Sequence, residues 1–217
     1  MKVSDPVAKR IASTGVVAVL VIDREEDAVP VAQALLAGGV DVMELTMRTP
    51  AALGALKAIR AEVPEMLAGI GTVLFPEQVA QVVEADAAFA VSPGLGRRVL
   101  AAAAGAGLPF APGIMTPSDI DGALEFGCEI LKFFPAGSSG GLKHLKNIAA
   151  PYAHLGLKYI PLGGVNAGNM GDYLGEEIIA AVGGSWLAPR DVIAAGGWSE
   201  ITRRASEAME LSRDARD

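Results

Sequence analysis

The stretch VDVMELTMRTPAALGALKAIRAEVP, Val40 to Pro64, contains the smallest unit from which the fold can be predicted. Its first eight residues are mostly apolar and are typical of a buried strand. Thr49 and Pro50 then provide the signals of a helix start, with Thr49 as the N-cap and Pro50 at the first helical position. The stretch therefore predicts one strand followed by one helix.

The same unit repeats along the chain. The segments FPEQVAQVVEADA and TPSDIDGALEFG open with similar helix-start signals, and EEDAVPVAQALLAGG ends at glycines, as helices often do. The predicted strands are eight runs: Gly15–Ile22, Val40–Met47, Met66–Val73, Ala88–Gly94, Leu108–Ile114, Glu129–Pro135, Leu157–Gly164 and Ile178–Leu187. Apolar strands that alternate with helices indicate a parallel sheet covered by helices. Eight such units predict a (β/α)8 TIM barrel.

An open doubly wound sheet is the alternative architecture. Such a sheet usually carries a glycine-rich dinucleotide loop after its first strand, and the segment here, VIDREED (Val21–Asp27), is not one. The chain has no linker or break in composition, so we predict that residues 1–217 form a single domain. The segment before Gly15 is expected to form a helix that closes the bottom of the barrel.

Composition excludes several classes of protein. The 217 residues are 51% hydrophobic and 20% charged, as in ordinary globular proteins. A net charge of −7 without a Lys/Arg cluster argues against nucleic-acid binding. Cys128 is the only cysteine, which excludes a disulfide framework and fits a reducing, cytoplasmic setting. The N-terminal segment lacks a signal-peptide core, and the uncharged run Val99–Met115 is too rich in alanine, glycine and proline to span a membrane.

The active site of a TIM barrel lies at the carboxyl ends of the strands. Polar residues, prolines and glycines stand at these predicted ends: Glu44, Arg48, Thr72, Pro93, Pro112, Gly113, Lys132, Gly163, Gly164, Gly183, Gly184 and Ser185. Any one of them could have a structural task, such as capping the next helix. Their convergence on one face of the barrel is the stronger signal and predicts a site there.

Lys132 lies in the middle of an apolar run, between Leu131 and Phe133. Its stem could snorkel and carry the charge to water. Alternatively, desolvation favours the neutral amine, which is the form that attacks a carbonyl carbon. Lys132 is therefore a candidate for a Schiff-base nucleophile.

Glu44 interrupts the second run in a similar way, either as an ion-pair partner of Arg48 or as a proton shuttle. The guanidinium of Arg48 suits a carboxylate ligand. Glycine pairs at the ends of the last two runs suit a phosphate, because bare backbone N–H groups bind anions there. His144 and His154 do not align on one helix face, which argues against a pair of metal ligands and against a zinc-dependent aldolase.

Seven segments carry a resemblance to a known family. They are AGGVDVMELTMRT (Ala37–Thr49), GIGTV (Gly69–Val73), FAVSPG (Phe89–Gly94), PGIMTPSD (Pro112–Asp119), LKFFPA (Leu131–Ala136), GGVNAGN (Gly163–Asn169) and GGSWL (Gly183–Leu187). In these segments the chain resembles the bacterial 2-keto-3-deoxy-6-phosphogluconate (KDPG) and 4-hydroxy-2-oxoglutarate aldolases. Their order and spacing are preserved from about residue 10 to residue 210.

The resemblance implies a (β/α)8 barrel, a homotrimer, and a class I aldolase that needs no metal or other cofactor. It implies that Lys132 forms a Schiff base with the C2 carbonyl of a 2-oxo acid and that Glu44 transfers protons. The implied substrate-binding residues are Arg48 and Thr72 for the carboxylate, Pro93 and Phe134 for the pocket walls, and Gly163, Gly164, Gly184 and Ser185 for the phosphate.

The chain departs from the family pattern at Leu162, where the family usually has a threonine. We predict an aldolase that cleaves KDPG into pyruvate and glyceraldehyde 3-phosphate, with no nucleic-acid or membrane partner. The alternatives are the same machinery acting on 4-hydroxy-2-oxoglutarate or on 2-keto-3-deoxy-6-phosphogalactonate, or a phosphate-binding barrel without lyase activity. Because of Leu162, the sequence leaves the physiological keto acid open.

Overall fold

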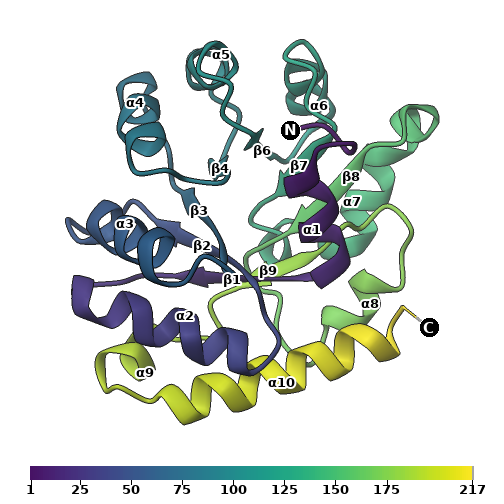
Figure 1. The fold of residues 1–217 in the computed structure, drawn as a ribbon. Helices are drawn as coiled ribbons and strands as arrows, with labels where there is room; N and C mark the ends of the chain where they lie inside the picture. The colour runs from purple at the N-terminus through teal and green to yellow at the C-terminus, as the bar shows by residue number, and fades with distance from the viewer. Residues whose placement is uncertain (217) are drawn as a thin grey trace.

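A computed structural model describes residues 1–216, and its strands form two parallel sheets (Figure 1). Six strands form a curled sheet in the order β5-β4-β3-β2-β1-β9, and three form a second sheet in the order β6-β7-β8. The strands are β1 (Val16–Leu20), β2 (Val42–Thr46), β3 (Leu67–Gly71), β4 (Ala90–Val91), β5 (Phe110–Ala111), β6 (Gly113–Ile114), β7 (Ile130–Phe133), β8 (Lys158–Pro161) and β9 (Val182–Gly184). Strands β1 to β5 are neighbours in chain order. This order lacks the reversal of a doubly wound sheet, so that alternative is wrong.

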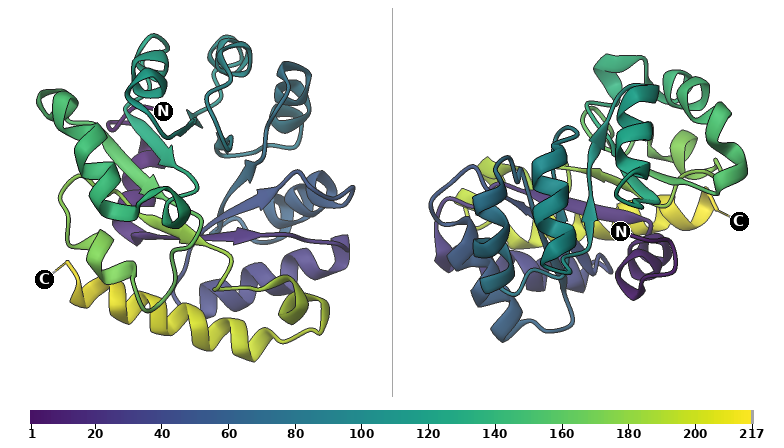
Figure 2. Two further views of the ribbon diagram at one scale, coloured as in Figure 1. Left: turned by 180° about the vertical axis from the view of Figure 1, so that it is seen from behind. Right: turned by 90° about the horizontal axis from the view of Figure 1, so that it is seen from above.

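Most helices lie around the outside of the strands, as two further views show (Figure 2). The α-helices are α1 (Pro6–Thr14), α2 (Ala28–Ala37), α3 (Ala52–Glu62), α4 (Pro76–Glu84), α5 (Arg97–Gly105), α6 (Pro117–Leu124), α7 (Gly141–Ala149), α8 (Met170–Leu174), α9 (Arg190–Ala194) and α10 (Trp198–Asp214). Three 3-10 helices are η1 (Glu25–Asp27), η2 (Gly137–Ser139) and η3 (Ala150–Leu155). Helix α10 lies along α2, where the Thr202 hydroxyl donates to the Ala34 carbonyl at 2.9 Å (Figure 1). No helix within residues 1–216 is both long and apolar enough to cross a membrane.

Helix α3 begins later than predicted. It starts at Ala52, with Ala51 as its N-cap, so the prediction of a cap at Thr49 is wrong. The Thr49 hydroxyl instead donates to the carbonyl of Ile22, in the loop that follows β1. This long-range hydrogen bond connects the loops after β1 and β2, and it takes the hydroxyl away from the helix end.

Pro112 divides the fifth predicted run into two strands. Strand β5 pairs with β4, whereas β6, two residues further on, pairs with β7. Proline has no N–H group to donate to a neighbouring strand, although its carbonyl still accepts from the Lys132 N–H at 2.9 Å. One short run therefore ends the first sheet and begins the second.

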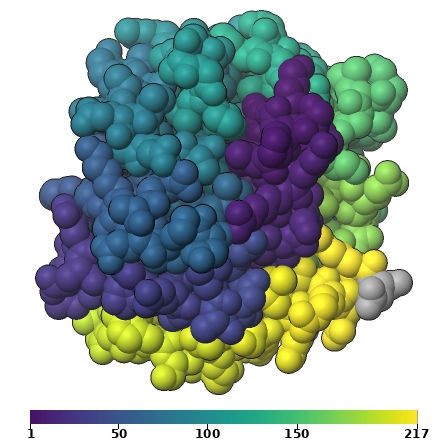
Figure 3. Space-filling view, viewed as in Figure 1, coloured from purple at the N-terminus to yellow at the C-terminus, as the bar shows by residue number. Residues whose placement is uncertain are grey.

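The two sheets share one interior. A buried apolar cluster contains side chains from both sheets and from α1: Ala8, Ile11, Val17, Val42, Leu67, Phe89, Val91, Ala111, Ile130, Ile160 and Leu162. Two isolated parallel bridges, Tyr159 with Ile179 and Leu162 with Gly183, also link the end of the second sheet to the segment of β9. Helix α1, purple in the space-filling view, packs on the molecule apart from the ring of outer helices (Figures 2 and 3).

Candidate active site

Lys132 and Glu44 form a buried ion pair. The Lys132 amine lies 3.1 Å from Oε1 and 3.3 Å from Oε2 of Glu44. The two side chains are only 8% and 3% exposed, so the lysine does not snorkel to water. A desolvated pair of this kind is costly unless its geometry is good.

Strand periodicity brings the two side chains together. On β7, Leu131 and Phe133 pack in the cluster beneath the helices, whereas Ile130 belongs to the interior cluster. Lys132 has the same parity as Ile130 and therefore points inward. On β2, Val42 is likewise an interior residue, and this places Glu44 on the inner face of its strand. Both charged groups are thus presented to the same interior.

A cavity of about 370 Å³ opens beside this pair. All ten predicted site residues line it: Glu44, Arg48, Thr72, Pro93, Lys132, Phe134, Gly163, Gly164, Gly184 and Ser185. Their positions in one cavity agree with the predicted convergence, and the role of each residue stays a prediction. Pro112, Gly113 and Gly183, which also stand at strand ends, do not line it.

Four more residues line the cavity: Val19, Thr46, Leu162 and Val165. Leu162 is the departure from the family pattern and is not among the predicted site residues. Thr46 lies two positions after Glu44 on the same strand face, and the period of two could have identified it. Val19 and Val165 carry no chemical signal that separates them from core valines.

Arg48 is held by Thr46 and not by Glu44. The Arg48 Nε donates to the Thr46 hydroxyl at 3.1 Å, and that hydroxyl donates to the Leu20 carbonyl at 3.0 Å. Within residues 1–216 the ion-pair partner of Glu44 is Lys132. The interpretation of Glu44 as a partner of Arg48 is therefore wrong for this structure.

Three residues of the cavity wall have a left-handed backbone. Gly163 and Gly164 have φ values of 84° and 88°, which glycine adopts without a steric penalty. Their N–H groups donate to no acceptor among the described residues, so they remain free to bind an anion. Thr72 has a φ of 63°, which is strained for a β-branched residue. Strain of this kind is concentrated at functional sites.

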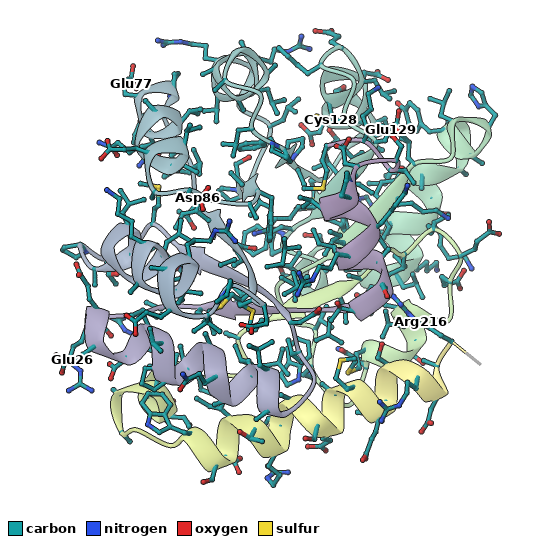
Figure 4. The ribbon with its side chains drawn as sticks, viewed as in Figure 1. Glu26, Glu77, Asp86, Cys128, Glu129 and Arg216 are labelled. Carbon is teal, nitrogen blue, oxygen red and sulfur yellow. The ribbon has the colours of Figure 1, made fainter. Side chains whose placement is uncertain are left out.

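Cys128 and the histidines lie outside the cavity. Cys128 precedes β7 and is buried near the N-terminal segment, as Figure 4 shows, and burial raises the pKa of its thiol. The Nε2 atom of His144 lies 3.0 Å from the carbonyl oxygen of Met115, and His154 lies in η3. Within residues 1–216, no three His, Cys, Asp or Glu side chains are grouped so that they could hold a metal ion.

The parallel α/β fold, with its lysine–carboxylate pair in an interior cavity, defines the chain first as an enzyme of the aldolase class. The protein-family model "Aldolase: KDPG and KHG aldolase" matches residues 7–204, and the chain belongs to this family. It is therefore a carbon–carbon lyase, and the alternative of a phosphate-binding barrel without lyase activity is not supported.

Named relatives and solved structures agree with the family match. The chain is 46% identical to the KHG/KDPG aldolase of Escherichia coli K12 over 204 residues, which is 94% of this chain and 95% of the relative. A crystal structure of the Legionella pneumophila KDPG aldolase, with pyruvate captured as a covalent carbinolamine intermediate, superposes with a TM-score of 0.88. The identity is 40%, and the match covers 93% of this chain and 97% of that one. The Zymomonas mobilis ZM4 enzyme with 3-phosphoglycerate gives a TM-score of 0.87 at 37% identity, covering 98% and 99% of the two chains.

Proposed function

We propose that this chain is a class I aldolase that cleaves KDPG into pyruvate and glyceraldehyde 3-phosphate. The observation that carries the proposal is the buried contact of the Lys132 amine with the Glu44 carboxylate, at 3.1 Å, on the wall of the cavity. A lysine amine is the group that forms a carbinolamine with a 2-oxo acid. The covalent pyruvate carbinolamine of the Legionella relative supports the same chemistry here.

The reaction begins at the C2 carbonyl of the substrate. The neutral Lys132 amine attacks this carbon, and the carbonyl oxygen takes a proton to give a carbinolamine. Loss of water then leaves an iminium ion, whose positive charge withdraws electrons from C3. Glu44 is the carboxylate in reach of the amine, so it accepts and returns the protons that these steps move.

Cleavage then breaks the bond between C3 and C4. A base removes the proton of the C4 hydroxyl, the C3–C4 electron pair moves into the iminium, and glyceraldehyde 3-phosphate leaves as the aldehyde. The remaining enamine gains a proton at C3, and hydrolysis of the imine releases pyruvate and regenerates the amine of Lys132. The iminium is the electron sink throughout, so the reaction needs no metal or other cofactor.

The other cavity residues bind the two ends of the substrate. Arg48, fixed by Thr46, would hold the C1 carboxylate together with Thr72. Pro93 and Phe134 would form the walls near the imine. The phosphate would be received by the backbone at Gly163, Gly164, Gly184 and Ser185.

A second candidate substrate is 4-hydroxy-2-oxoglutarate, which would yield pyruvate and glyoxylate. The observation that favours it is Leu162, which lines the cavity as an apolar, 4% exposed side chain where the family usually has a hydroxyl. An apolar wall offers less to a hydroxylated sugar acid than to a shorter substrate. The galactonate-derived isomer, 2-keto-3-deoxy-6-phosphogalactonate, uses the same machinery and belongs in the same comparison.

We further propose that residues 1–217 are a single domain in which the two sheets are parts of one (β/α)8 barrel. The shared interior cluster and the bridges at Tyr159 and Leu162 support this arrangement. Ala8 and Ile11 of α1 pack into that cluster, which supports α1 as the helix that closes the barrel bottom. The homotrimer and the cytoplasmic location stay predictions from the resemblance and the composition.

The proposal is tested with purified protein and three keto acids. We expect turnover of KDPG to exceed that of 4-hydroxy-2-oxoglutarate and of the galactonate isomer, with pyruvate as the common product. Borohydride added with pyruvate should attach one reduced pyruvyl group to Lys132, as read by mass spectrometry. Dialysis against EDTA should leave the rate unchanged, and a rate that falls and returns with added zinc would contradict the imine mechanism.

A further inference from the structure

Strand β3 presents glycine at two inward positions beside Glu44. Ala68 and Ile70 pack in the cluster beneath the helices, so the alternate residues Gly69 and Gly71 face the interior. In the register of β2 with β3, Glu44 lies opposite Gly69, and Gly71 lies two positions further along, opposite Thr46. Gly71 is therefore the diagonal neighbour of Glu44 on the inner face of the sheet.

The Glu44 carboxylate occupies the space that a side chain at position 71 would take. A Cβ atom added to Gly71 would lie 1.8 Å from Oε1 of Glu44 and 2.5 Å from its carboxyl carbon. Oε1 is also the oxygen that lies 3.1 Å from the Lys132 amine. The carboxylate therefore could not keep its contact with Lys132 if residue 71 carried even a methyl group.

The backbone does not require glycine at this position. Gly71 lies outside the left-handed region, unlike the next residue, Thr72, with a φ of 63°. Alanine could adopt the backbone of Gly71 without strain. Glycine is thus needed at position 71 because a side chain there would take the space that the Glu44 carboxylate occupies.

We propose that Gly71 is a positioning residue, which fixes the reach of the Glu44 carboxylate toward the Lys132 amine. The inference rests on the proposed function, since it concerns how that reaction is set up. The carboxylate is the mobile end of a side chain that borders the cavity, so it can turn into that space without moving packed residues. Substitution of Gly71 by alanine should therefore leave the chain folded and slow the reaction.

Gly69 provides a contrast on the same strand. A Cβ there would lie 2.5 Å from the ring of Phe89, a buried aromatic of the interior cluster. A packed ring has no free direction in which to move, so Gly69→Ala should lower the melting temperature. Gly69 thus leaves room for the packed ring of Phe89, whereas Gly71 leaves room for the carboxylate of Glu44.

The test is a double-mutant cycle. We expect Gly71→Ala to lower kcat by about 10- to 100-fold, a part of what general acid–base catalysis contributes, while thermal unfolding checks that the variant is folded. The Cγ of Glu44 also lies 2.8 Å from the added Cβ, so only a residue without a γ atom, such as alanine, leaves the space above Gly71 empty. Adding Gly71→Ala to Glu44→Ala should therefore cost less than about 3-fold. An equal loss in both backgrounds would overturn the proposal, because Gly71 would then act independently of the carboxylate.

A second measurement does not depend on the substrate. The rate at which acetic anhydride labels Lys132, followed by mass spectrometry of the Lys132 peptide, should rise in Gly71→Ala, because an amine that is no longer held by both oxygens of the Glu44 carboxylate is free to react with the reagent. Gly105→Ala, with nothing within 4 Å of its added Cβ, is the matched control and should label at the parental rate. An unchanged labelling rate in Gly71→Ala would overturn the proposal. If the unsubstituted protein turned over none of the keto acids, the proposed function would be overturned instead. The labelling rates would still show whether Gly71 positions Glu44 against Lys132.

Discussion

Lys132 and Glu44 lie 88 positions apart in the chain, yet the amine of one approaches both carboxylate oxygens of the other. The pair joins β7 of the second sheet to β2 of the first. Removal of one partner from a buried ion pair leaves the other uncompensated, at a cost of about 3–5 kcal/mol unless the remaining group changes its protonation. Substitutions at this pair therefore report on folding and on chemistry, and the two readouts have to be measured together.

Lys132→Arg should abolish both pyruvate trapping and turnover. Arginine keeps a positive charge opposite Glu44, but its guanidinium does not lose a proton to become a nucleophile. Mass spectrometry after borohydride treatment should find no pyruvyl group on the variant, while thermal unfolding checks that the chain is folded. A folded variant that still cleaves KDPG at a substantial rate would remove Lys132 from the mechanism.

Glu44→Gln should reduce kcat by about 10²- to 10⁴-fold, because glutamine keeps the shape of the side chain and loses the proton transfer. Pyruvate binding should persist, since Arg48 and Thr72 would still hold its carboxylate. The half-saturating pyruvate concentration for borohydride trapping measures this binding separately from turnover. Normal turnover of the variant would assign Glu44 to a structural role as the partner of Lys132.

Leu162→Thr tests the departure from the family pattern. The threonine hydroxyl can hydrogen-bond the distal part of KDPG, and one neutral hydrogen bond of about 0.5–1.5 kcal/mol changes kcat/KM roughly 2- to 13-fold. We expect kcat/KM for KDPG to rise within that range. Stability should fall at the same time, because Leu162 belongs to the interior cluster and packs on Gly183.

The same kinetics with 4-hydroxy-2-oxoglutarate serve as the control for this substitution. Pyruvate trapping at Lys132 should not change. The assignment of KDPG as substrate would be refuted if Leu162→Thr had a lower kcat/KM for KDPG and the unsubstituted protein strongly preferred another keto acid. The imine mechanism would remain in place.

Thr72→Gly should separate the backbone strain at position 72 from the contribution of the Thr72 hydroxyl to pyruvate binding. Glycine adopts a φ of 63° freely, whereas a β-branched residue there is strained by roughly 1–2 kcal/mol. The free energy of unfolding should therefore stay within about 1 kcal/mol of the parent, in spite of the greater entropy of the unfolded chain. Pyruvate binding should weaken by about 10- to 150-fold, the value of a hydrogen bond of 1.5–3 kcal/mol to a charged group.

Thr72→Ser is the matched control, since it keeps the hydroxyl and removes the methyl group. Its pyruvate binding should remain near that of the parent, as measured by the trapping assay. If Thr72→Gly binds pyruvate as well as the parent does, the hydroxyl of Thr72 has no part in holding the carboxylate.

Local patterns in the sequence identified the strands and the chemistry. Every predicted run contains a strand of the structure, because apolar runs bounded by turn residues are a property of neighbouring positions. The position of Lys132 inside such a run was enough to make it a candidate nucleophile. The ten residues predicted for the site all line one cavity, since parallel strands bring their carboxyl ends to the same edge.

Contacts between distant segments were decided by the tertiary structure alone. The sequence left the partner of Glu44 open, and the arrangement of the strands pairs it with Lys132 instead of the nearby Arg48. A hydrogen bond to Ile22 moved Thr49 away from the helix cap that its local sequence favours. The space above Gly71 is also a tertiary feature, because it exists only where β2 and β3 lie in register. The sequence by itself thus determined which residues are candidates for the chemistry, whereas the register and curl of the sheets decided which of them touch, because those distances depend on every strand between them.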